Sequence, residues 1–164
     1  MNKILNHTQI HQKITRIAHE IIENSFEEEK IFIAGICGNG FKIANEIGQV
    51  ISENSEIKPT VFEIMIDKEN PLSNEIQASI DTNLIKNEFV VLVDDVVNSG
   101  KTMQYALTKI LENPTKNIKT VALVDRTHRR FPIKCDFVGL TLSTTIKNRV
   151  EVDFSNEESF AYLI

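Results

Sequence analysis

Apolar residues recur along the chain with a helical spacing in some stretches and as short unbroken runs in others. Between residues 10 and 22 they recur every three or four positions, which predicts one apolar face of a helix. That face consists of Ile10, Ile14, Ile17, Ala18, Ile21 and Ile22. Asn6 and Thr8 precede or open this stretch, and both are residue types that commonly cap a helix N-terminus.

The rest of the chain alternates between the same two patterns. An apolar run at 31–35 ends at Gly35 and predicts a buried strand, and the spacing of apolar residues over 41–51 predicts a second helix. Further strands are predicted at 60–66, 89–93, 120–124 and 137–140, with a helix over 103–111 that ends before Pro114. Alternating strands and helices are typical of an α/β domain, in which helices cover both faces of a mostly parallel sheet.

The segment 67–87 interrupts this alternation. It is polar and weakly patterned, so we predict that it is mostly loop. A loop of roughly 20 residues is long for a compact domain and is usually functional or disordered. We find no repeat or linker that divides the chain, and we therefore predict that residues 1–164 form a single domain.

Composition narrows the class of protein. The 164 residues carry a net charge of −5, which excludes a basic field over the whole protein but not a local basic patch. No apolar run approaches the roughly 20 residues needed to cross a bilayer, and residues 1–12 are too polar for a signal peptide. Cys37 and Cys135 lack metal-ligand spacing. We therefore expect a cytoplasmic protein with two reduced thiols and no membrane partner.

The richest chemistry lies in residues 90–102, which read V-V-L-V-D-D-V-V-N-S-G-K-T. A hydrophobic strand delivers Asp94 and Asp95 to its C-terminal end, where open α/β sheets bind ligands. Small residues follow immediately before a helix, so backbone N–H groups and the helix N-terminus are available to a phosphate. Side-chain donors come from Ser99, Lys101 and Thr102.

Three interpretations compete for this segment. A nucleoside-triphosphate loop requires a glycine five positions before Gly100, where this chain has Asp95. A purely structural turn with a helix cap does not require two adjacent carboxylates after an apolar strand. The third is a loop for 5-phosphoribosyl-1-pyrophosphate (PRPP), in which Asp94 and Asp95 face ribose hydroxyls and the turn holds the 5-phosphate. We favour the third.

The segment resembles the PRPP signature of type I phosphoribosyltransferases, which joins a hydrophobic run and two acidic residues to Thr/Ser-Gly-Lys/Arg-Thr. The resemblance is greatest to the bifunctional pyrimidine-operon attenuation regulators and uracil phosphoribosyltransferases, and it runs from about residue 4 to about residue 152. The other blocks that carry it are 15–20, 31–40, 124–129, 132–133 and 136–139. The resemblance implies the type I phosphoribosyltransferase fold plus a small hood, and a homodimer.

The resemblance also implies roles for individual residues. Asp94 and Asp95 would bind the ribose 2- and 3-hydroxyls, directly or through Mg²⁺ and water. Asn98, Ser99, Gly100, Lys101 and Thr102 would hold the 5-phosphate, and Cys37, Gly38, Asn39 and Gly40 would face pyrophosphate. The hood, formed by the N-terminal segment and residues 125–152, would place Asp125, Arg126 and His128 near the base, and Lys68 would lie on a flap at 67–87. The implied reaction transfers phosphoribose to a nucleobase, most simply uracil.

Two stretches depart from this family pattern. The family usually has Lys-Thr-Arg-Gly where this chain has Cys37 to Gly40, so both basic side chains are missing. The flap of the family carries a Tyr-Arg-Asp-Asp-like stretch, whereas this chain has Asp67-Lys68-Glu69-Asn70-Pro71. Lys68 does not replace a bidentate arginine. Slower catalysis or a changed substrate is therefore one hypothesis.

Other functions stay open. One is a weakly catalytic or non-catalytic regulator that senses PRPP or a nucleotide and binds RNA. Another is a purine phosphoribosyltransferase. Purine enzymes usually place a lysine beside the aspartate that corresponds to Asp125, so the sequence Val124-Asp125-Arg126 disfavours a purine substrate. RNA would require the local basic residues Lys13, Arg16, His19, Arg126, His128, Arg129, Arg130, Lys134, Lys147 and Arg149. We favour ordinary surface charge for these, polar surface for His7 and His11, and a small space-filling role for Cys37.

Overall fold

The computed structural model describes residues 2–143, 145, 148–155 and 157–164. Its elements in chain order are β1 (Asn2–Leu5), α1 (His7–Asn24), β2 (Lys30–Ile36), α2 (Asn39–Asn54), β3 (Lys58–Met65), β4 (Gln77–Ala78), the 3-10 helix η1 (Thr82–Ile85), β5 (Phe89–Val97), α3 (Lys101–Ile110), β6 (Asn117–Asp125), β7 (Phe137–Thr141), β8 (Val150–Asp153) and β9 (Phe160–Leu163). The strands form a six-stranded sheet of order β4-β3-β2-β5-β6-β7 and a three-stranded sheet of order β1-β9-β8.

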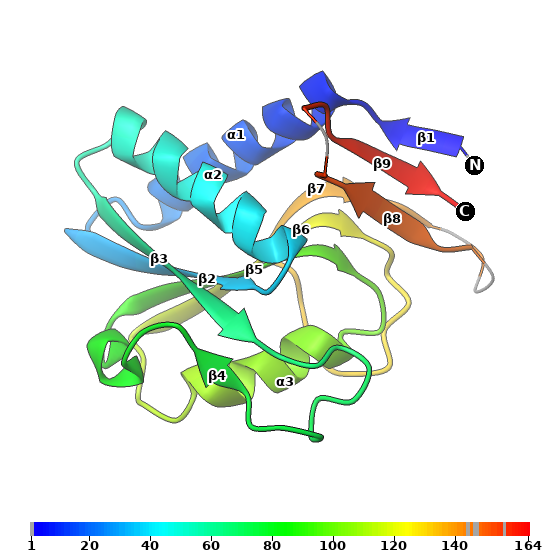
Figure 1. Ribbon diagram of the computed structural model, residues 1–164. Helices are drawn as coiled ribbons and strands as arrows, with labels where there is room; N and C mark the ends of the chain where they lie inside the picture. Colours follow the sequence, from blue (N-terminus) through cyan, green and yellow to red (C-terminus); the bar gives the residue numbers. More distant parts are fainter. Residues whose placement is uncertain (1, 144, 146–147, 156) are drawn as a thin grey trace.

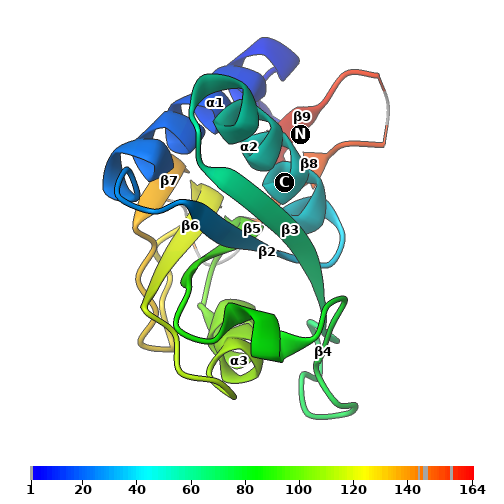
Figure 2. The ribbon, with the colours of Figure 1, turned by 90° about the vertical axis from the view of Figure 1, so that its left-hand side faces the viewer.

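The larger sheet is parallel except for β4, which pairs antiparallel with β3. Helices α1 and α2 cover one face of it, and α3 covers the other (Figures 1 and 2). Along β5 the side chains alternate between these layers, because Val91 and Val93 join the core under α1 and α2 while Val90 and Leu92 join the core over α3. A strand buried on both faces is apolar throughout, which explains the unbroken run at 89–93. The α/β prediction is confirmed.

The start of α1 shows how local sequence sets an element boundary. The side chain of Asn6 accepts a hydrogen bond from the backbone N–H of Gln9 at 2.9 Å, and the side chain of Gln9 accepts one from the N–H of Asn6 at 2.9 Å. This reciprocal pair satisfies two N–H groups that the first helical turn leaves without partners. Asn6 is therefore the cap, as predicted, while Thr8 lies inside the helix.

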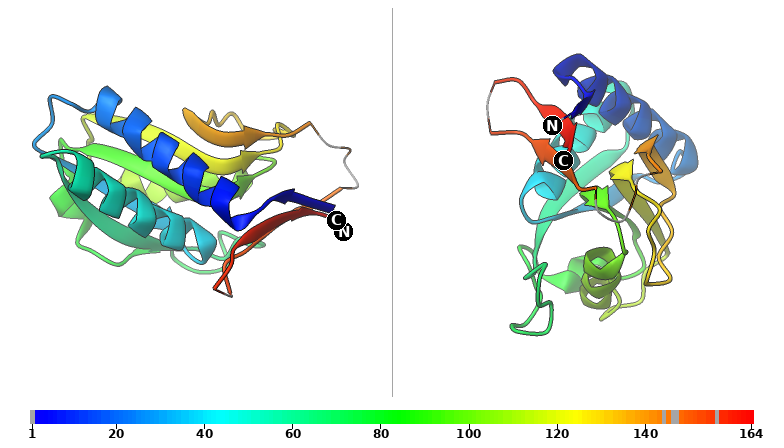
Figure 3. Two further views of the ribbon diagram at one scale, coloured as in Figure 1. Left: turned by 90° about the horizontal axis from the view of Figure 1, so that it is seen from above. Right: turned by 90° about the vertical axis from the view of Figure 1, so that its right-hand side faces the viewer.

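The small sheet joins the two ends of the chain. Strands β1 and β9 pair antiparallel, and β9 pairs with β8, so that the termini lie side by side (Figure 3). None of these strands was predicted. Each has only four residues, which is too short for a period-two pattern to emerge, and their pairing joins residues far apart in sequence. The hood assigned to the N-terminal segment and 125–152 stays a prediction; the small sheet itself extends to Leu163.

Several boundaries differ from those predicted. Strand β3 begins at Lys58, and the segment 67–87 contains β4 and η1, so it is less of a loop than its composition indicated. Strand β5 does not stop at Val93 but continues to Val97, because its ladder with β6 extends to the pair Val97 and Asp125. Asp94 and Asp95 thus lie within a strand. Among the described residues, no helix is long and apolar enough to span a membrane.

Candidate active site

The turn from β5 into α3 requires a glycine. Gly100 caps α3 with a φ of 83°, a left-handed conformation that favours glycine. A Cβ atom built on it would lie 2.2 Å from Cγ2 of Ile133, so there is no room for a side chain either. Ser99 Oγ accepts a hydrogen bond from the backbone N–H of Lys101 at 3.2 Å and shapes the turn. We call residues 94–102, which comprise the end of β5, the turn and the first two residues of α3, the 94–102 loop.

A pocket of about 90 Å³ lies within this loop. It is lined by Asp94, Val96, Val97, Asn98, Ser99, Gly100, Lys101, Thr102 and Met103. The pocket lies at the N-terminus of α3, where the helix dipole and the backbone N–H groups of the first turn favour an anion. Its size and its donors fit a phosphate group. Here the structure brings together the residues that the sequence assigned to the 5-phosphate.

Asp94 is the more unusual of the two carboxyl groups. Its residue is 3% exposed, and one carboxyl oxygen, Oδ1, accepts from the backbone N–H of Asp95 at 2.9 Å. The same oxygen lies 3.4 Å from Nζ of Lys68. Burial, together with the negative charge of Asp95, raises the pKa of Asp94 to about 8, although Lys68 acts in the opposite direction. Asp94 therefore ionises less readily than an exposed aspartate, and a cation beside it would favour its charged form.

Asp95 is half-buried and held by a residue from another loop. Its Oδ1 accepts from the backbone N–H of Val96 at 2.7 Å, and its Oδ2 accepts from Nδ2 of Asn39 at 3.0 Å. The same Nδ2 donates to the carbonyl of Val152 in β8 at 2.8 Å. Asn39 therefore links the loop before α2, the carboxylate and the small sheet. The sequence placed Asn39 in the site but gave no signal for Val152.

The loop from Cys37 to Gly40 packs directly against Asp94. A Cβ atom on Gly40 would lie 2.8 Å from the carbonyl oxygen of Val93 and 3.2 Å from Oδ1 of Asp94, so only glycine allows this approach. Gly38 has a φ of 87°, and a Cβ there would meet no atom within 4 Å. Cys37 Sγ lies 3.4 Å from the carbonyl oxygen of Ile66, to which it donates, in keeping with a packing role.

The segment after β6 closes over the other side of the 94–102 loop. The backbone N–H groups of Arg130 and Phe131 donate to the carbonyl of Ser99 at 2.9 and 3.0 Å. Arg129 donates from Nη1 to the carbonyl of Asn98 at 2.8 Å, and its Nη2 pairs with Asp125 at 3.0 Å. The sequence placed Arg129 in the hood segment but did not predict its bond to Asn98, because that bond joins segments about thirty residues apart.

A second pocket of about 420 Å³ adjoins this segment and is lined by Asn98, Ser99, Arg126, His128, Arg129 and Arg130. Its lining includes two of the three predicted base-contacting residues. Arg126 is 4% exposed, and burial lowers its pKa. Its Nη2 donates to the backbone carbonyls of Thr145 and Asn148, so part of its guanidinium is used to hold these two residues.

The decisive observation comes from comparison with known families. The model for "Phosphoribosyl transferase domain" matches residues 1–157. The chain belongs to the phosphoribosyltransferase family. It is 36% identical to "Bifunctional protein PyrR" of Clostridium novyi, over 95% of this chain and 92% of that protein. It is 34% identical to the protein of that name from Haemophilus ducreyi, over 93% of this chain and 89% of that protein.

Solved phosphoribosyltransferases share the fold. A hypoxanthine phosphoribosyltransferase of Trypanosoma cruzi superimposes with a TM-score of 0.75 at 16% identity, covering 98% of this chain and 95% of the other. A hypoxanthine-guanine phosphoribosyltransferase of Bacillus anthracis gives a TM-score of 0.70 at 18% identity, covering 87% and 82%. These structures confirm the fold class, while the family model and the PyrR relatives confirm the family and a pentosyltransferase activity. The roles given to individual site residues stay predictions.

The carboxyl groups fit a divalent cation that arrives with the substrate of a phosphoribosyltransferase. Mg²⁺ usually takes one or two carboxylates and completes its shell with water and substrate phosphates. Asp94 and Asp95 supply two such groups, and no cluster of three or more His, Cys, Asp or Glu ligands occurs in the part of the chain that the structure describes. A protein-only metal cage is therefore not formed there, whereas a site shared with phosphate oxygens fits.

Lys68, which the sequence assigned to a flap, contacts Asp94 from the segment after β3. Asp67 Oδ1 accepts from the backbone N–H groups of Glu69 and Asn70 at 3.0 and 3.1 Å, which folds residues 67–70 into a turn and lowers the pKa of Asp67. Burial alone would lower the pKa of Lys68, but the charges of Asp94 and Asp95 outweigh it and raise that pKa.

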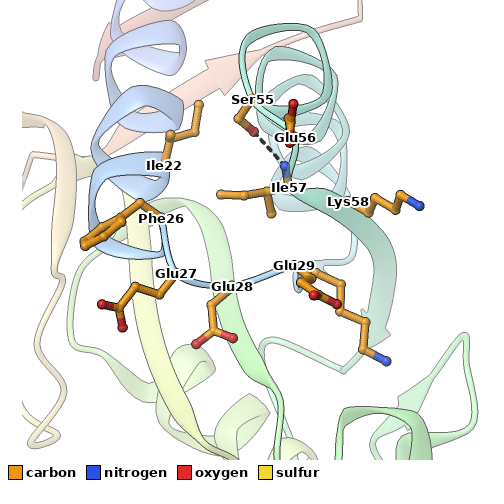
Figure 4. A pocket seen from close by; sticks show the side chains of 10 residues that line it. Ile22, Phe26, Glu27, Glu28, Glu29, Ser55, Glu56, Ile57 and Lys58 are labelled. Carbon is orange, nitrogen blue, oxygen red and sulfur yellow. Dashed lines mark hydrogen bonds between the residues drawn. The ribbon is translucent and has the colours of Figure 1, made fainter.

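A hollow of about 660 Å³ lies far from this site, near the N-terminal ends of β2 and β3 (Figure 4). Its rim carries Glu27, Glu28, Glu29 and Glu56 beside the exposed ring of Phe26. Clustered carboxylates repel phosphate, so this larger hollow does not suit PRPP. The volume of a hollow alone therefore does not locate the proposed phosphate site.

His7 and His11 differ from the polar surface predicted for them. Both are half-buried. His7 Nδ1 accepts from the backbone N–H of Ser159 at 3.0 Å, and Nδ1 of His11 contacts Oε1 of Glu46. The partner Ser159 lies about 150 positions away in the sequence. The two histidines thus fasten the C-terminal segment to α1 and α2, a contact that the local sequence pattern does not reveal.

Proposed function

We propose that the chain transfers the phosphoribosyl group of PRPP to uracil and releases pyrophosphate. The observation that carries the proposal is the convergence of two carboxyl groups, the 94–102 loop and the Cys37–Gly40 loop around Asp94. The family match supports the reaction class. Uracil comes from the resemblance of the sequence, and the relatives named as bifunctional PyrR proteins are consistent with it.

Each part of the site has a task in this proposal. The turn at Ser99–Thr102 and the N-terminus of α3 bind the 5-phosphate and fix the position of the sugar. Asp94 and Asp95 bind the ribose hydroxyls, and Asn39 holds Asp95 in the orientation that this requires. Arg126 and His128 line the pocket where the base is expected, and Asp125 pairs with Arg129 of the same pocket. Holding both reactants in line converts the encounter into an effectively unimolecular step.

The chemistry is displacement of pyrophosphate from ribose C1 by a ring nitrogen of the base. The C–O bond to pyrophosphate breaks as the new N–C bond forms, the proton of the attacking nitrogen passes to the departing pyrophosphate or to water, and positive charge develops on the sugar in the transition state. Asp94 and Asp95 offset that charge from the hydroxyl side. Mg²⁺, held by these carboxylates and the substrate phosphates, would supply charge neutralisation of the leaving group. Gly38 and Gly40 offer backbone contacts where the family offers basic side chains.

A steady-state assay tests this function. Pyrophosphate release would be followed with PRPP, Mg²⁺ and one base at a time, taking uracil, hypoxanthine and guanine. We expect release with uracil, and its loss when Asp94→Asn and Asp95→Asn are combined. Release with the purines alone would replace uracil by a purine substrate and contradict the proposal.

A second candidate is a PRPP- or nucleotide-sensing regulator that binds RNA. The word "bifunctional" in the relatives' name and the missing cations of the Cys37–Gly40 loop favour it. The expected basic patch is smaller than the sequence indicated, because Arg126 is buried; Lys147 lies outside the described residues. Binding carried by phosphate contacts weakens steeply with salt. Filter binding at low and high salt would show it, and no RNA retention at low salt would remove it.

We also propose that the chain forms a homodimer, on the strength of the family resemblance alone. Light scattering coupled to size-exclusion chromatography measures the mass directly. A monomer at all concentrations tested would contradict it.

A further inference from the structure

Lys68 contacts the most buried charge of the site although it comes from a different segment. It follows β3 by three residues, and its Nζ lies 3.4 Å from Oδ1 of Asp94. The side chain of Asp94 is 4% exposed, whereas that of Lys68 is 40% exposed. The ammonium group thus approaches the carboxyl group from the solvent side, which is the side from which a ligand would come.

A second lysine holds the same segment in place. Lys101, in the 94–102 loop, donates from Nζ to the backbone carbonyl of Glu69 at 3.4 Å. The turn formed by Asp67 fixes Glu69 relative to Lys68. Residues 67–70 are therefore docked on the loop proposed to bind phosphate, and Lys68 is presented to Asp94.

The position of this ammonium has an electrostatic consequence. Asp94 and Asp95 are adjacent carboxyl groups, and a cation beside them offsets the repulsion between their charges and so favours the ionised form of Asp94. A divalent cation that binds Asp94 must come close to the oxygen that Lys68 now contacts. Ammonium and metal repel each other and compete for one carboxylate oxygen. The metal therefore binds Asp94 more weakly while Lys68 stays beside that oxygen.

We propose that Lys68 is a tethered cation that occupies the place beside Asp94 while PRPP is absent, and that it moves to the pyrophosphate group when PRPP and Mg²⁺ enter together. This inference rests on the proposed function for the identity of the ligand. It explains how the chain works without the basic side chains of the Cys37–Gly40 loop: one lysine balances the carboxylates in the empty site and the pyrophosphate in the loaded one. It also makes binding of the metal alone unfavourable.

Metal binding without substrate tests the inference. Mn²⁺ replaces Mg²⁺, and free Mn²⁺ is measured by electron paramagnetic resonance, with and without PRPP. Lys68→Met keeps the length of the side chain and removes its charge, while Lys68→Gln is a second neutral variant and Lys68→Arg keeps the charge. Lys58→Met is the matched control, because Lys58 is an exposed lysine at the far end of the same strand, β3.

The inference predicts effects of opposite sign. Without PRPP, both neutral variants bind Mn²⁺ about tenfold more tightly than the wild-type protein, and Lys68→Arg and Lys58→Met match the wild type. With Mn²⁺ present, the neutral variants bind PRPP about tenfold more weakly, because a charge-assisted contact is lost.

Unchanged Mn²⁺ affinity in Lys68→Met and Lys68→Gln without PRPP would overturn the inference. Failure of the wild-type protein to bind PRPP would instead overturn the proposed function. In that case the comparison with Mn²⁺ alone still decides whether Lys68 competes with a cation, so the two failures are distinguishable.

Discussion

Two loops of this molecule occupy equivalent places in the fold, between a parallel strand and the helix that follows it, but differ in chemistry. The Cys37–Gly40 loop leads from β2 into α2, and the 94–102 loop leads from β5 into α3. Each helix is capped by a glycine with positive φ, 87° at Gly38 and 83° at Gly100. Both loops lie at C-terminal ends of neighbouring parallel strands, where α/β proteins bind ligands.

The difference lies in what surrounds the two glycines. Gly100 is enclosed by Ile133 and followed by lysine and threonine, whereas Gly38 is open and its neighbours are cysteine and asparagine. One loop retains the side chains of a phosphate site, and the other retains only its backbone. The comparison teaches that a fold can keep the shape of a subsite after its charged side chains are gone, with charge supplied from elsewhere.

The largest expected effect concerns the charge of the 94–102 loop. Because the pKa of Asp94 is raised to about 8, the folded protein keeps a proton that the unfolded chain releases near pH 4. The free energy of unfolding therefore falls as pH rises from about 4 to about 8, by up to roughly 1.4 kcal/mol per pH unit. Asp94→Asn removes this dependence, which urea unfolding at pH 5, 6.5 and 8 measures. Parallel pH profiles for the two proteins would contradict it.

A smaller effect separates the two glycines. Gly100→Ala combines a left-handed backbone with a clash against Ile133, and we expect a loss of roughly 2–4 kcal/mol in the free energy of unfolding. Gly38→Ala meets only the backbone strain, about 1–2 kcal/mol. Thermal unfolding of both variants compares them directly. If Gly38→Ala lost as much stability as Gly100→Ala, the two loops would not differ in the way described.

The smallest effect concerns Asn39, which links the two loops. Asn39→Ala removes the hydrogen bonds to Asp95 and to the carbonyl of Val152, and we expect a loss of about 1 kcal/mol in the free energy of unfolding. Because Asp95 loses its orientation, kcat/KM should fall about tenfold. Asn45→Ala is the control, since Asn45 is exposed on the same helix and donates only within it, to the carbonyl of Phe41. Equal kinetics for both variants would dismiss an orienting role for Asn39.

The sequence predicted what local pattern can encode. The spacing of apolar residues predicted α1, α2 and α3, and the apolar runs predicted five strands of the larger sheet. The Asp94–Thr102 motif predicted a phosphate-binding loop, and the structure forms a small pocket there. The sequence pattern did not predict contacts between segments that lie far apart along the chain. The bonds of Asn39 to Val152, of Arg129 to Asn98 and of His7 to Ser159 each join separate parts of the chain. No spacing rule reports such pairs, because folding alone brings them together.

The end of β5 shows a second limit. Polar Asp94 and Asp95 indicated that the strand ended at Val93, yet pairing with β6 continues to Val97. The ladder is satisfied by backbone groups of the neighbouring strand, and side-chain polarity does not interrupt it. The carboxyl groups are more rigid than residues of a loop would be, which suits a site that must hold a sugar in one orientation.

The most direct test is calorimetric titration of PRPP, with Mg²⁺, into the wild-type protein and into the variant that combines Asp94→Asn and Asp95→Asn. We predict saturable binding by the wild-type protein and an affinity at least about tenfold lower in the variant, since charge-assisted contacts to the ribose and the cation are removed. No binding by the wild-type protein, or equal binding by both proteins, would contradict the assignment of the 94–102 loop.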